Sequence, residues 1–232
     1  MAQLTPHSPH IITLAETSQE DAVAAEVVQC LQHDGVAVLP TETVYGICAQ
    51  AGLGASGEVR EDADVSVCPA AQRIYAIKER PHSLPLPLLV ADTSWLKTLA
   101  PQTPTYALEL AQAFWPGALT LIVRVTPEAA RSFGTSVDQT IGIRCPQYPF
   151  VKAVLDKLGT PLFATSANTH GNPSPLAAGQ LEIALCNQAD IIVDGGTCAV
   201  GTASTVVLCT GDRPLIVRSG EITQEDIERA LL

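Results

Sequence analysis

The chain has 232 residues, of which 47% are hydrophobic and 16% are charged. This composition predicts a large buried core and excludes a disordered chain. The net charge of −11 argues against binding nucleic acid by diffuse electrostatic attraction. An anionic ligand must therefore be held by a local group drawn from the 13 Lys and Arg residues.

The seven cysteines are an odd number and contain no C-x-x-C pair, which argues against both a disulfide framework and a zinc site. We expect them to be small buried hydrophobes in a reducing compartment. No apolar run reaches the roughly 18 residues of a membrane span, and the N-terminus lacks a basic region followed by an apolar one. We therefore expect a cytosolic protein that binds neither a membrane nor a resident metal.

Short buried strands alternate with helices in the first half of the chain. Hydrophobic patterning predicts strands at 11–14 and 36–39, helices carrying 23–31 and 70–79, and an apolar segment at 85–90. Gly35 is expected at the C′ position after the first helix, and Pro81 is expected to halt the second. The residues at 52–69 are rich in Gly, Ala and acid, which predicts a surface loop.

The second half continues the alternation. It predicts helices ending near 115 and spanning 150–158 and 176–189, and strands at 119–125, 140–144, 162–164, 190–193, 204–208 and 215–218. Thr223 and Asp226 are expected to cap a last short helix. Because no repeat or long Gly/Ser linker divides the chain, we predict a single domain over 1–232 with a twisted mixed α/β sheet and flanking helices.

Two of the predicted strands run directly into small polar residues. The strand at 162–164 is followed by TSAN and a Gly/Pro loop, and the strand at 36–39 is followed by PTETVYG. Open α/β sheets bind ligands at such strand ends. Ordinary turns also use Ser, Asn, Gly and Pro, so one such end is equally well explained as a turn. Two in one chain favour a shared site.

Basic residues recur at the ends of the predicted elements, at Lys78, Arg80, Arg144 and Arg218. Small hydroxyl and amide side chains occupy similar positions: Thr41, Thr43, Thr120, Thr165, Ser166, Asn168 and Ser204. Such a set suits a polyphosphate, although cations at a helix end can simply complement its dipole. No nucleophile–base pair, Walker A loop or G-x-G-x-x-G motif is present. We therefore expect catalysis by positioning and electrostatics, as in nucleotidyl transfer.

Seven segments, in this order, resemble the YrdC/Sua5 family: PTETVYG (40–46), IKERP (77–81), WPGALTLIV (115–123), IGIRCP (141–146), TSANTHGNPSP (165–175), ASTVV (203–207) and VRSG (217–220). The resemblance implies a YrdC-like fold with an open basic cavity. It also implies a threonylcarbamoyl-AMP synthase that joins L-threonine, bicarbonate and ATP, with Mg²⁺, and releases pyrophosphate. The product would supply the t6A modification at position 37 of tRNA through a separate transferase protein.

Residue roles follow from the resemblance, position by position. Lys78 and Arg80 would bind the ATP phosphates and neutralise the leaving pyrophosphate, which makes them the expected catalytic pair. Ser166, Asn168 and Arg218 would also bind ATP. The threonine substrate would be held by Thr41, Thr43, Thr120 and Ser204. Further cavity residues would be Tyr45, Arg144 and Thr165.

The chain departs from the family pattern at three positions. Leu84 stands where the family usually has Lys or Asn, Leu176 replaces a threonine, and His170 replaces a serine. The loop at 55–69 also exceeds the usual length. Leu84 and Leu176 favour a second reading, a non-catalytic paralogue that binds nucleotide or RNA, whereas the retained Lys78, Arg80, Ser166 and Asn168 argue against it.

A third reading is the carbamoyl-transferring domain of hydrogenase-maturation enzymes. It lacks support because those proteins carry zinc-finger cysteines, whereas the cysteines of this sequence show no such pattern. With a net charge of −11, the chain is expected to bind tRNA weakly or not at all.

Overall fold

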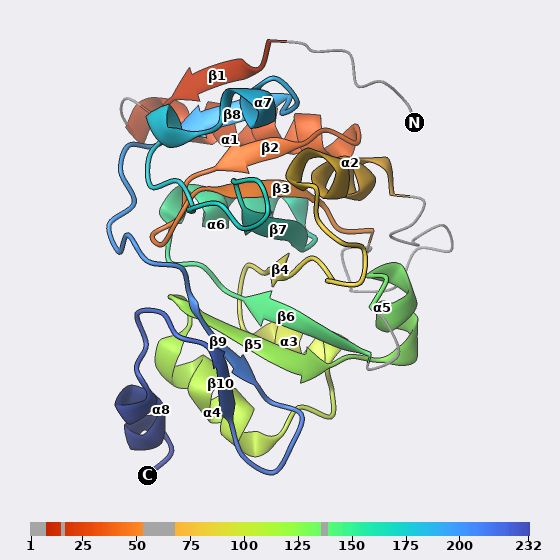
Figure 1. Ribbon diagram of the computed structural model, residues 1–232, viewed down its shortest axis with the longest axis vertical. Helices are drawn as coiled ribbons and strands as arrows, with labels where there is room; N and C mark the ends of the chain where they lie inside the picture. Colours follow the sequence, from red (N-terminus) through yellow and green to blue (C-terminus); the bar gives the residue numbers. More distant parts are fainter. Residues whose placement is uncertain (1–7, 15–16, 53–67, 136–138) are drawn as a thin grey trace.

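The computed structural model describes residues 8–14, 17–52, 68–135 and 139–232. One mixed sheet contains ten strands in the order β1–β8–β2–β3–β7–β4–β6–β5–β9–β10 (Figure 1). The strands are β1 (His10–Thr13), β2 (Ala37–Leu39), β3 (Gly46–Gln50), β4 (Leu88–Leu89), β5 (Leu119–Arg124), β6 (Thr140–Arg144), β7 (Leu162–Ser166), β8 (Ile191–Asp194), β9 (Thr205–Leu208) and β10 (Leu215–Arg218). The predicted fold class is confirmed, and the predicted strands agree with these within a few residues.

The described helices flank this sheet. They are α1 (Thr17–Gln32), α2 (Pro69–Lys78), α3 (Ser94–Leu99), α4 (Thr105–Phe114), α5 (Pro127–Ser132), α6 (Pro149–Leu158), α7 (Ile183–Cys186) and α8 (Gln224–Ala230). The capping box of α8 is present, with Thr223 Oγ1 accepting from the Asp226 amide at 3.1 Å. The predicted loop at 52–69 lies outside the described residues, apart from its ends.

Two hydrophobic cores lie on opposite faces of the sheet. Helices α1 and α6 pack against each other and cover β8, β2, β3 and β7, where alternate side chains such as Leu39, Cys48 and Leu162 join one core. The intervening side chains, such as Val38, Ile47 and Phe163, join a larger core with α2, α3, α4 and α5. The alternation follows from the two-residue period of a strand.

The sheet is narrowest in its middle. Strand β4 has two residues, and these pair in parallel with β6 and antiparallel with β7. Strands β1 to β3, β7 and β8 thus lie on one side of β4, and β5, β6, β9 and β10 lie on the other (Figure 1). No described helix of the α1/α6 core covers the sheet beyond β4, so that part of the face is open.

Two sequence predictions need correction. The segment 176–189 is not one helix, because only a 3₁₀ turn at Ala178–Gln180 and the four-residue α7 are helical. The residue with left-handed backbone after α1 is Asp34, with φ 59°, and not Gly35. Gly35 is needed for space, since a Cβ there would lie 2.3 Å from Sγ of Cys30.

Candidate functional site

A cavity of about 290 Å³ lies on the open face of the sheet and spans both sides of β4. Eight of the predicted site residues line it: Thr41, Arg80, Thr120, Arg144, Thr165, Ser166, Ser204 and Arg218. The cavity is hollow because its floor carries small residues, among them Gly46, Gly142 and Ala164. Strand β4 and the segment before it contribute an apolar wall through Leu89, Pro85 and Pro87.

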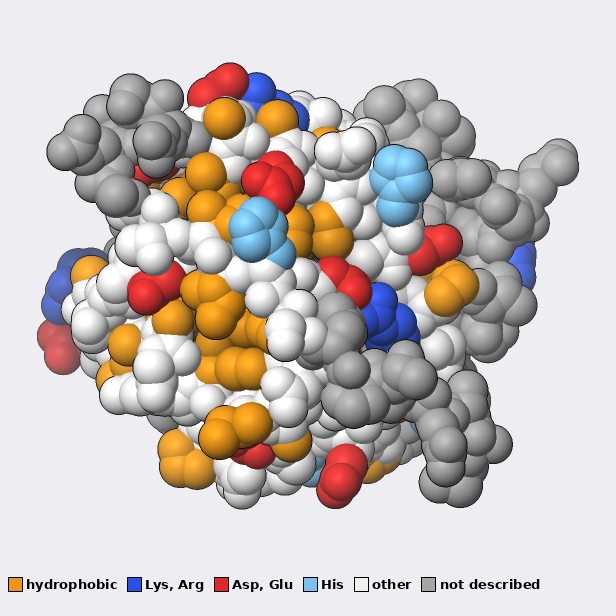
Figure 2. All heavy atoms as spheres, turned by 90° about the horizontal axis from the view of Figure 1, so that it is seen from above, with side chains coloured by type: hydrophobic (Ala, Val, Ile, Leu, Met, Phe, Trp, Pro, Cys, Tyr) orange, Lys and Arg blue, Asp and Glu red, His pale blue; other side chains and the backbone are white. Residues whose placement is uncertain are grey.

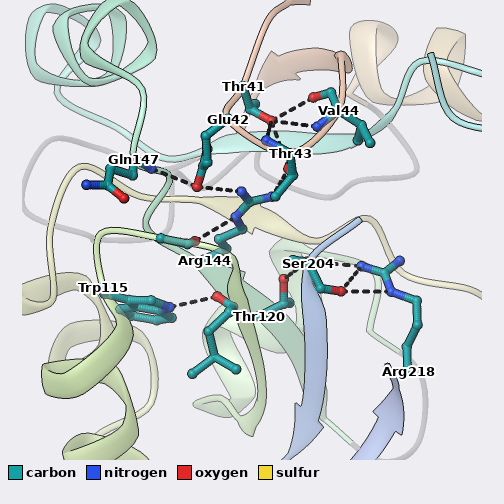
Figure 3. A network of polar contacts seen from close by, with 12 residues as sticks. Thr41, Glu42, Thr43, Val44, Trp115, Thr120, Arg144, Gln147, Ser204 and Arg218 are labelled. Atoms are coloured by element: carbon teal, nitrogen blue, oxygen red, sulfur yellow. Dashed lines mark hydrogen bonds and ion pairs between the residues drawn. The ribbon is translucent and has the colours of Figure 1, made fainter. Parts of the chain in front are cut away.

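The loop between β2 and β3 is held by its own hydroxyl groups. Thr41 Oγ1 donates to the Val44 carbonyl at 2.6 Å and accepts from the Thr43 and Val44 amides, both at 3.2 Å. The Thr43 hydroxyl lies 2.9 Å from the Thr41 hydroxyl. Because the Thr41 hydrogen is already committed to Val44, Thr43 donates to Thr41. The small polar residues after β2 therefore shape the loop as well as line the cavity (Figure 3).

Arg144, at the end of β6, is fixed by three partners. Its Nε donates to the Gly117 carbonyl at 3.0 Å, and its Nη1 donates to Thr43 Oγ1 at 2.8 Å. Its Nη2 lies 2.7 Å from Glu42 Oε1, which also accepts from the Gln147 amide at 3.0 Å. Glu42 and Arg144 are only 8% and 7% exposed, so the ion pair is buried and its geometry is fixed (Figure 3).

Glu42 is a residue that the sequence analysis missed. Its position between two threonines in PTETVYG was visible, but an acidic residue has no evident place in an anion-binding cavity. The structure supplies the reason, since its carboxylate offsets and orients the buried guanidinium of Arg144.

A second polar group joins β5, β9 and β10. The hydroxyls of Thr120 and Ser204 lie 2.7 Å apart. Arg218 donates through Nε and Nη2 to the Ser204 carbonyl at 3.1 and 2.8 Å, and through Nη2 to Ser204 Oγ at 3.0 Å. Residues far apart in the sequence thus converge on one hydroxyl in the cavity wall (Figure 3).

Arg80 and Lys78 differ in their placement. Arg80 lines the cavity, and its Nε and Nη2 donate to the carbonyls of Leu84 and Pro85, each at 3.0 Å. Lys78 is 2% exposed and lies outside the lining, and its Nζ donates to the carbonyls of Ser166, at 2.5 Å, and Asn168. Burial, together with the nearby charge of Arg80, lowers the pKa of Lys78 to about 8.

Three other predicted residues also lie outside the cavity lining. Thr43 stands behind it as the acceptor for Arg144. Tyr45 is buried, and its hydroxyl donates to the Gly196 carbonyl at 2.7 Å and accepts from the Gly195 amide at 3.1 Å. Asn168 lines a neighbouring hollow, where its Nδ2 donates to the Thr169 and Asn172 carbonyls at 2.8 and 2.7 Å. These three side chains support the loops around the cavity.

The hydrogen-bond donors of the side chains that line the cavity are cationic guanidinium groups and neutral hydroxyl groups. Three arginines and six hydroxyl-bearing residues line it, and none of the described residues in the lining carries a carboxylate. Among the described residues, no three His, Cys, Asp or Glu side chains gather where they could hold a metal ion. In the same part of the chain, no helix is long and apolar enough to cross a membrane. The cavity is therefore suited to an anion that carries its own hydrogen-bond acceptors.

The fold and cavity define an α/β protein with an arginine-lined cavity on an open sheet face. A family model for Sua5, YciO and YrdC, described as "Telomere recombination", matches residues 63–220. The chain belongs to this family.

Individual relatives agree with this assignment. The chain is 38% identical over 216 residues to the threonylcarbamoyl-AMP synthase of Bacillus subtilis, a match that covers 93% of this chain and 58% of the relative. Sua5 of Pyrococcus abyssi, in a crystal structure with L-threonine, superimposes with a TM-score of 0.80 at 30% identity, covering 95% of this chain and 60% of that one. Escherichia coli YciO matches with a TM-score of 0.73 at 27% identity, covering 91% and 95%. The chain thus spans little more than half the length of the first two relatives.

Proposed function

We propose that this chain is an L-threonylcarbamoyladenylate synthase that uses L-threonine, bicarbonate and ATP and releases pyrophosphate. The observation that carries the proposal is the pairing of three arginines with the Thr120–Ser204 hydroxyl pair in one cavity. The relatives support the same chemistry, since one is named as this synthase and another binds L-threonine in its crystal structure.

The proposed reaction has two steps. The neutral amine of threonine and bicarbonate form a carbamate and water. A carbamate oxygen then attacks the α-phosphorus of ATP, and the bond to the bridging oxygen breaks to release pyrophosphate. Neither step needs a protein nucleophile, so the protein contributes by placing the two substrates together and stabilising negative charge.

We assign the ATP phosphates to Arg80 and Arg218. Unlike Arg144, these two arginines form no buried ion pair with a described residue. Arg80 and Arg218 line the cavity, both are held through main-chain carbonyls, and neither forms an ion pair with a described Asp or Glu. Ser166 lies on the same wall as Arg80. Lys78 supports this wall through the Ser166 and Asn168 carbonyls. We propose that Arg80 and Arg218 neutralise the leaving pyrophosphate, with Lys78 adding positive charge from behind.

We assign L-threonine to the end of the cavity that carries Thr120 and Ser204. Thr120 and Ser204 present a hydroxyl pair there, and Arg144 and Thr41 lie on the same cavity. Hydroxyls and a fixed guanidinium suit an amino acid's carboxylate and ammonium groups. Because Glu42 already offsets the charge of Arg144, Arg144 adds less positive charge to this end than Arg80 adds to the other, and Arg218, 3.0 Å from Ser204 Oγ, lies between the two ends. The two ends of the cavity are thus suited to ligands of different charge.

Mg²⁺ is proposed to enter with the nucleotide. The lining offers hydroxyls and no carboxylate, and Mg²⁺ is commonly bound through substrate phosphates while it keeps several waters. When bound, the ion would offset phosphate charge. We also propose that the product is transferred to a separate t6A transferase. We further propose that the protein is located in the cytosol. The seven free cysteines support the setting.

The test is a reconstitution with purified protein, ATP, Mg²⁺, L-threonine and bicarbonate. Mass spectrometry should detect threonylcarbamoyl-AMP, and pyrophosphate should appear in equal amount. Both signals should disappear when threonine or bicarbonate is left out. Pyrophosphate release that does not depend on threonine would contradict the proposal.

One observation favours a second function, nucleotide binding without catalysis. Leu84 follows the arginine loop with its side chain 41% exposed, where the family usually carries Lys or Asn. In this second case, calorimetry would detect ATP binding, while the reconstitution would yield no adenylate. Detection of the adenylate rules it out.

A further inference from the structure

Gly220, two residues after β10, lies directly against the backbone that carries Ser204. A Cβ atom on residue 220 would lie 2.3 Å from the Ala203 carbonyl oxygen, 2.4 Å from the Thr205 amide nitrogen and 2.6 Å from the Ser204 carbonyl carbon. Contacts below 3.0 Å are essentially never observed for real Cβ atoms. All three neighbours are main-chain atoms, so no side-chain rotation can relieve the clash. A side chain at position 220 would therefore move one of the two backbone segments.

The segment beside Gly220 is held on its other side as well. The Thr205 amide donates to the Ala118 carbonyl at 2.9 Å, which ties it to the start of β5. The Thr205 hydroxyl donates to the Ile222 carbonyl at 2.7 Å. Residues 203–205 are thus clamped between β5 and the chain at 218–222. The Ser204 hydroxyl, 2.7 Å from that of Thr120, faces the cavity because of this clamp.

Glycine is required at position 220 because there is no space for a Cβ atom, and not because the backbone adopts an unusual φ angle. Gly220 is absent from the residues with positive φ, whereas Gly196 and Gly201, with φ 82° and 69°, are among them. Gly211, in the turn between β9 and β10, offers a matched control. A Cβ on Gly211 would meet no atom within 4 Å, and its φ is not positive either.

We propose that Gly220 is a positioning residue for the amino-acid end of the cavity. It touches no ligand. Its missing side chain lets the chain after β10 close onto residues 203–205, and this contact sets the distance between the Ser204 and Thr120 hydroxyls. The assignment of L-threonine to that end rests on the proposed function, whereas the placement of Ser204 by Gly220 does not.

The first measurement needs no enzymatic activity. Hydrogen exchange of the Thr205 amide should be faster by about tenfold or more in Gly220→Ala than in the wild type, because the shifted backbone weakens the bond to Ala118. Gly211→Ala should exchange like the wild type at this amide. Unchanged exchange in Gly220→Ala would overturn the proposal. Global unfolding of Gly220→Ala would also overturn it, because the contact would then maintain the whole fold and not one wall of the cavity.

The second measurement compares the KM values of the two substrates. Gly220→Ala should raise the KM for L-threonine by about tenfold and raise the KM for ATP less, as expected when one hydrogen-bonding group is displaced. Ser204→Ala should give a similar change, and Gly211→Ala none. Equal KM values in Gly220→Ala and the wild type would contradict the role in substrate binding. If the wild type makes no adenylate, the proposed function fails, and the exchange measurement still decides the role of Gly220.

Discussion

Arg80 presents its charge to the cavity while its side chain also fixes a loop. Its two contacts are to the carbonyls of Leu84 and Pro85, which lie in the segment leading to β4. Removing it therefore deletes a phosphate ligand and loosens the residues next to that ligand. It breaks no buried ion pair, so the cost in stability is small.

We predict that Arg80→Ala lowers ATP affinity by about ten- to a hundredfold, the effect of one lost charge-assisted contact. Pyrophosphate release at subsaturating ATP should fall accordingly. The unfolding temperature should stay within a few degrees of the wild type. Arg131→Ala is the control, because Arg131 forms an exposed pair with Glu128 at 3.7 Å on α5. A large loss of thermal stability in Arg80→Ala would identify this arginine as structural.

Lys78 provides a pH test of a buried cation. Its pKa is lowered from 10.5 to about 8 in the folded protein, chiefly by burial. Between these two values the unfolded chain keeps the proton while the folded protein has lost it. The free energy of unfolding contributed by Lys78 therefore rises with pH through this window.

We predict that the stability difference between wild type and Lys78→Met grows in favour of the wild type from about pH 8 to pH 10. Denaturant unfolding of both proteins across this range measures it, and groups common to both cancel. A difference that stays constant with pH would show that Lys78 titrates like an exposed lysine.

At the scale of elements, the loop after α2 carries the clearest departure from the family. Leu84 is 41% exposed, and its carbonyl accepts hydrogen bonds from both Tyr75 Oη, at 3.2 Å, and Arg80. Its backbone is thus fixed, while its side chain has few constraints. A polar side chain at this position is compatible with the same backbone, and under the proposed function it would lie near the nucleotide.

We predict that Leu84→Asn tightens ATP binding by about tenfold through one added hydrogen bond to a charged group. Calorimetric titration measures the change. The unfolding temperature should not fall, because the leucine is largely exposed. Ile11→Asn, which alters an exposed apolar residue on β1, should leave ATP affinity unchanged. Unaltered affinity in Leu84→Asn would mean that this position does not face the nucleotide.

A comparison of the predicted and observed helices and strands shows what the sequence can predict. Strands such as β6 were predicted from hydrophobic patterning with the correct bounds, because buried Ile141 and Ile143 alternate with partly buried residues and give the two-residue period of a strand. Helix α5 was missed, although Thr126 before Pro127 is an N-terminal signal and its hydroxyl accepts from the Ala129 amide at 3.2 Å. In 176–189 the predicted helix is broken up, and Glu182 binds the Thr169 hydroxyl, a long-range contact that local propensity cannot reveal.

The sequence predicted which residues form the candidate site, but it did not predict which of them contact one another. The strand ends and the family motifs identified residues that the structure brings to one cavity, such as Thr120 and Ser204. Their hydroxyls meet across 84 residues of sequence, and Arg144 reaches Thr43 across 101. Such pairings depend on strand order, which periodicity does not encode. For the same reason, the role of Glu42 became evident only from its contact with Arg144.

For the whole molecule, charge is the dominant property. The net charge of −11 opposes the polyanionic backbone of tRNA. On the face above β1 and β8, Lys and Arg side chains stand apart from one another, with Asp and Glu between them (Figure 2). The described residues of that face form no continuous basic surface.

We predict that the isolated protein binds tRNA more weakly than micromolar at ~150 mM salt, where charges beyond the Debye length of about 8 Å are screened. Fluorescence anisotropy with labelled tRNA measures the dissociation constant. Submicromolar binding at that salt would contradict the prediction and would require a local basic surface.

The two-residue strand β4 has a mechanical consequence for the whole molecule. Arg80 and Ser166 come from one side of this strand, and Ser204 and Arg218 come from the other. Among the described residues, Leu88 and Leu89 provide the strand pairing that connects the two parts of the sheet. The buried contacts of Arg144 with Glu42 and Thr43 also cross this narrow waist, because Arg144 lies on β6 and its two partners lie in the loop between β2 and β3. Under the proposed function, the distance between the two walls that hold the substrates thus depends on a two-residue strand and on the buried contacts of one arginine.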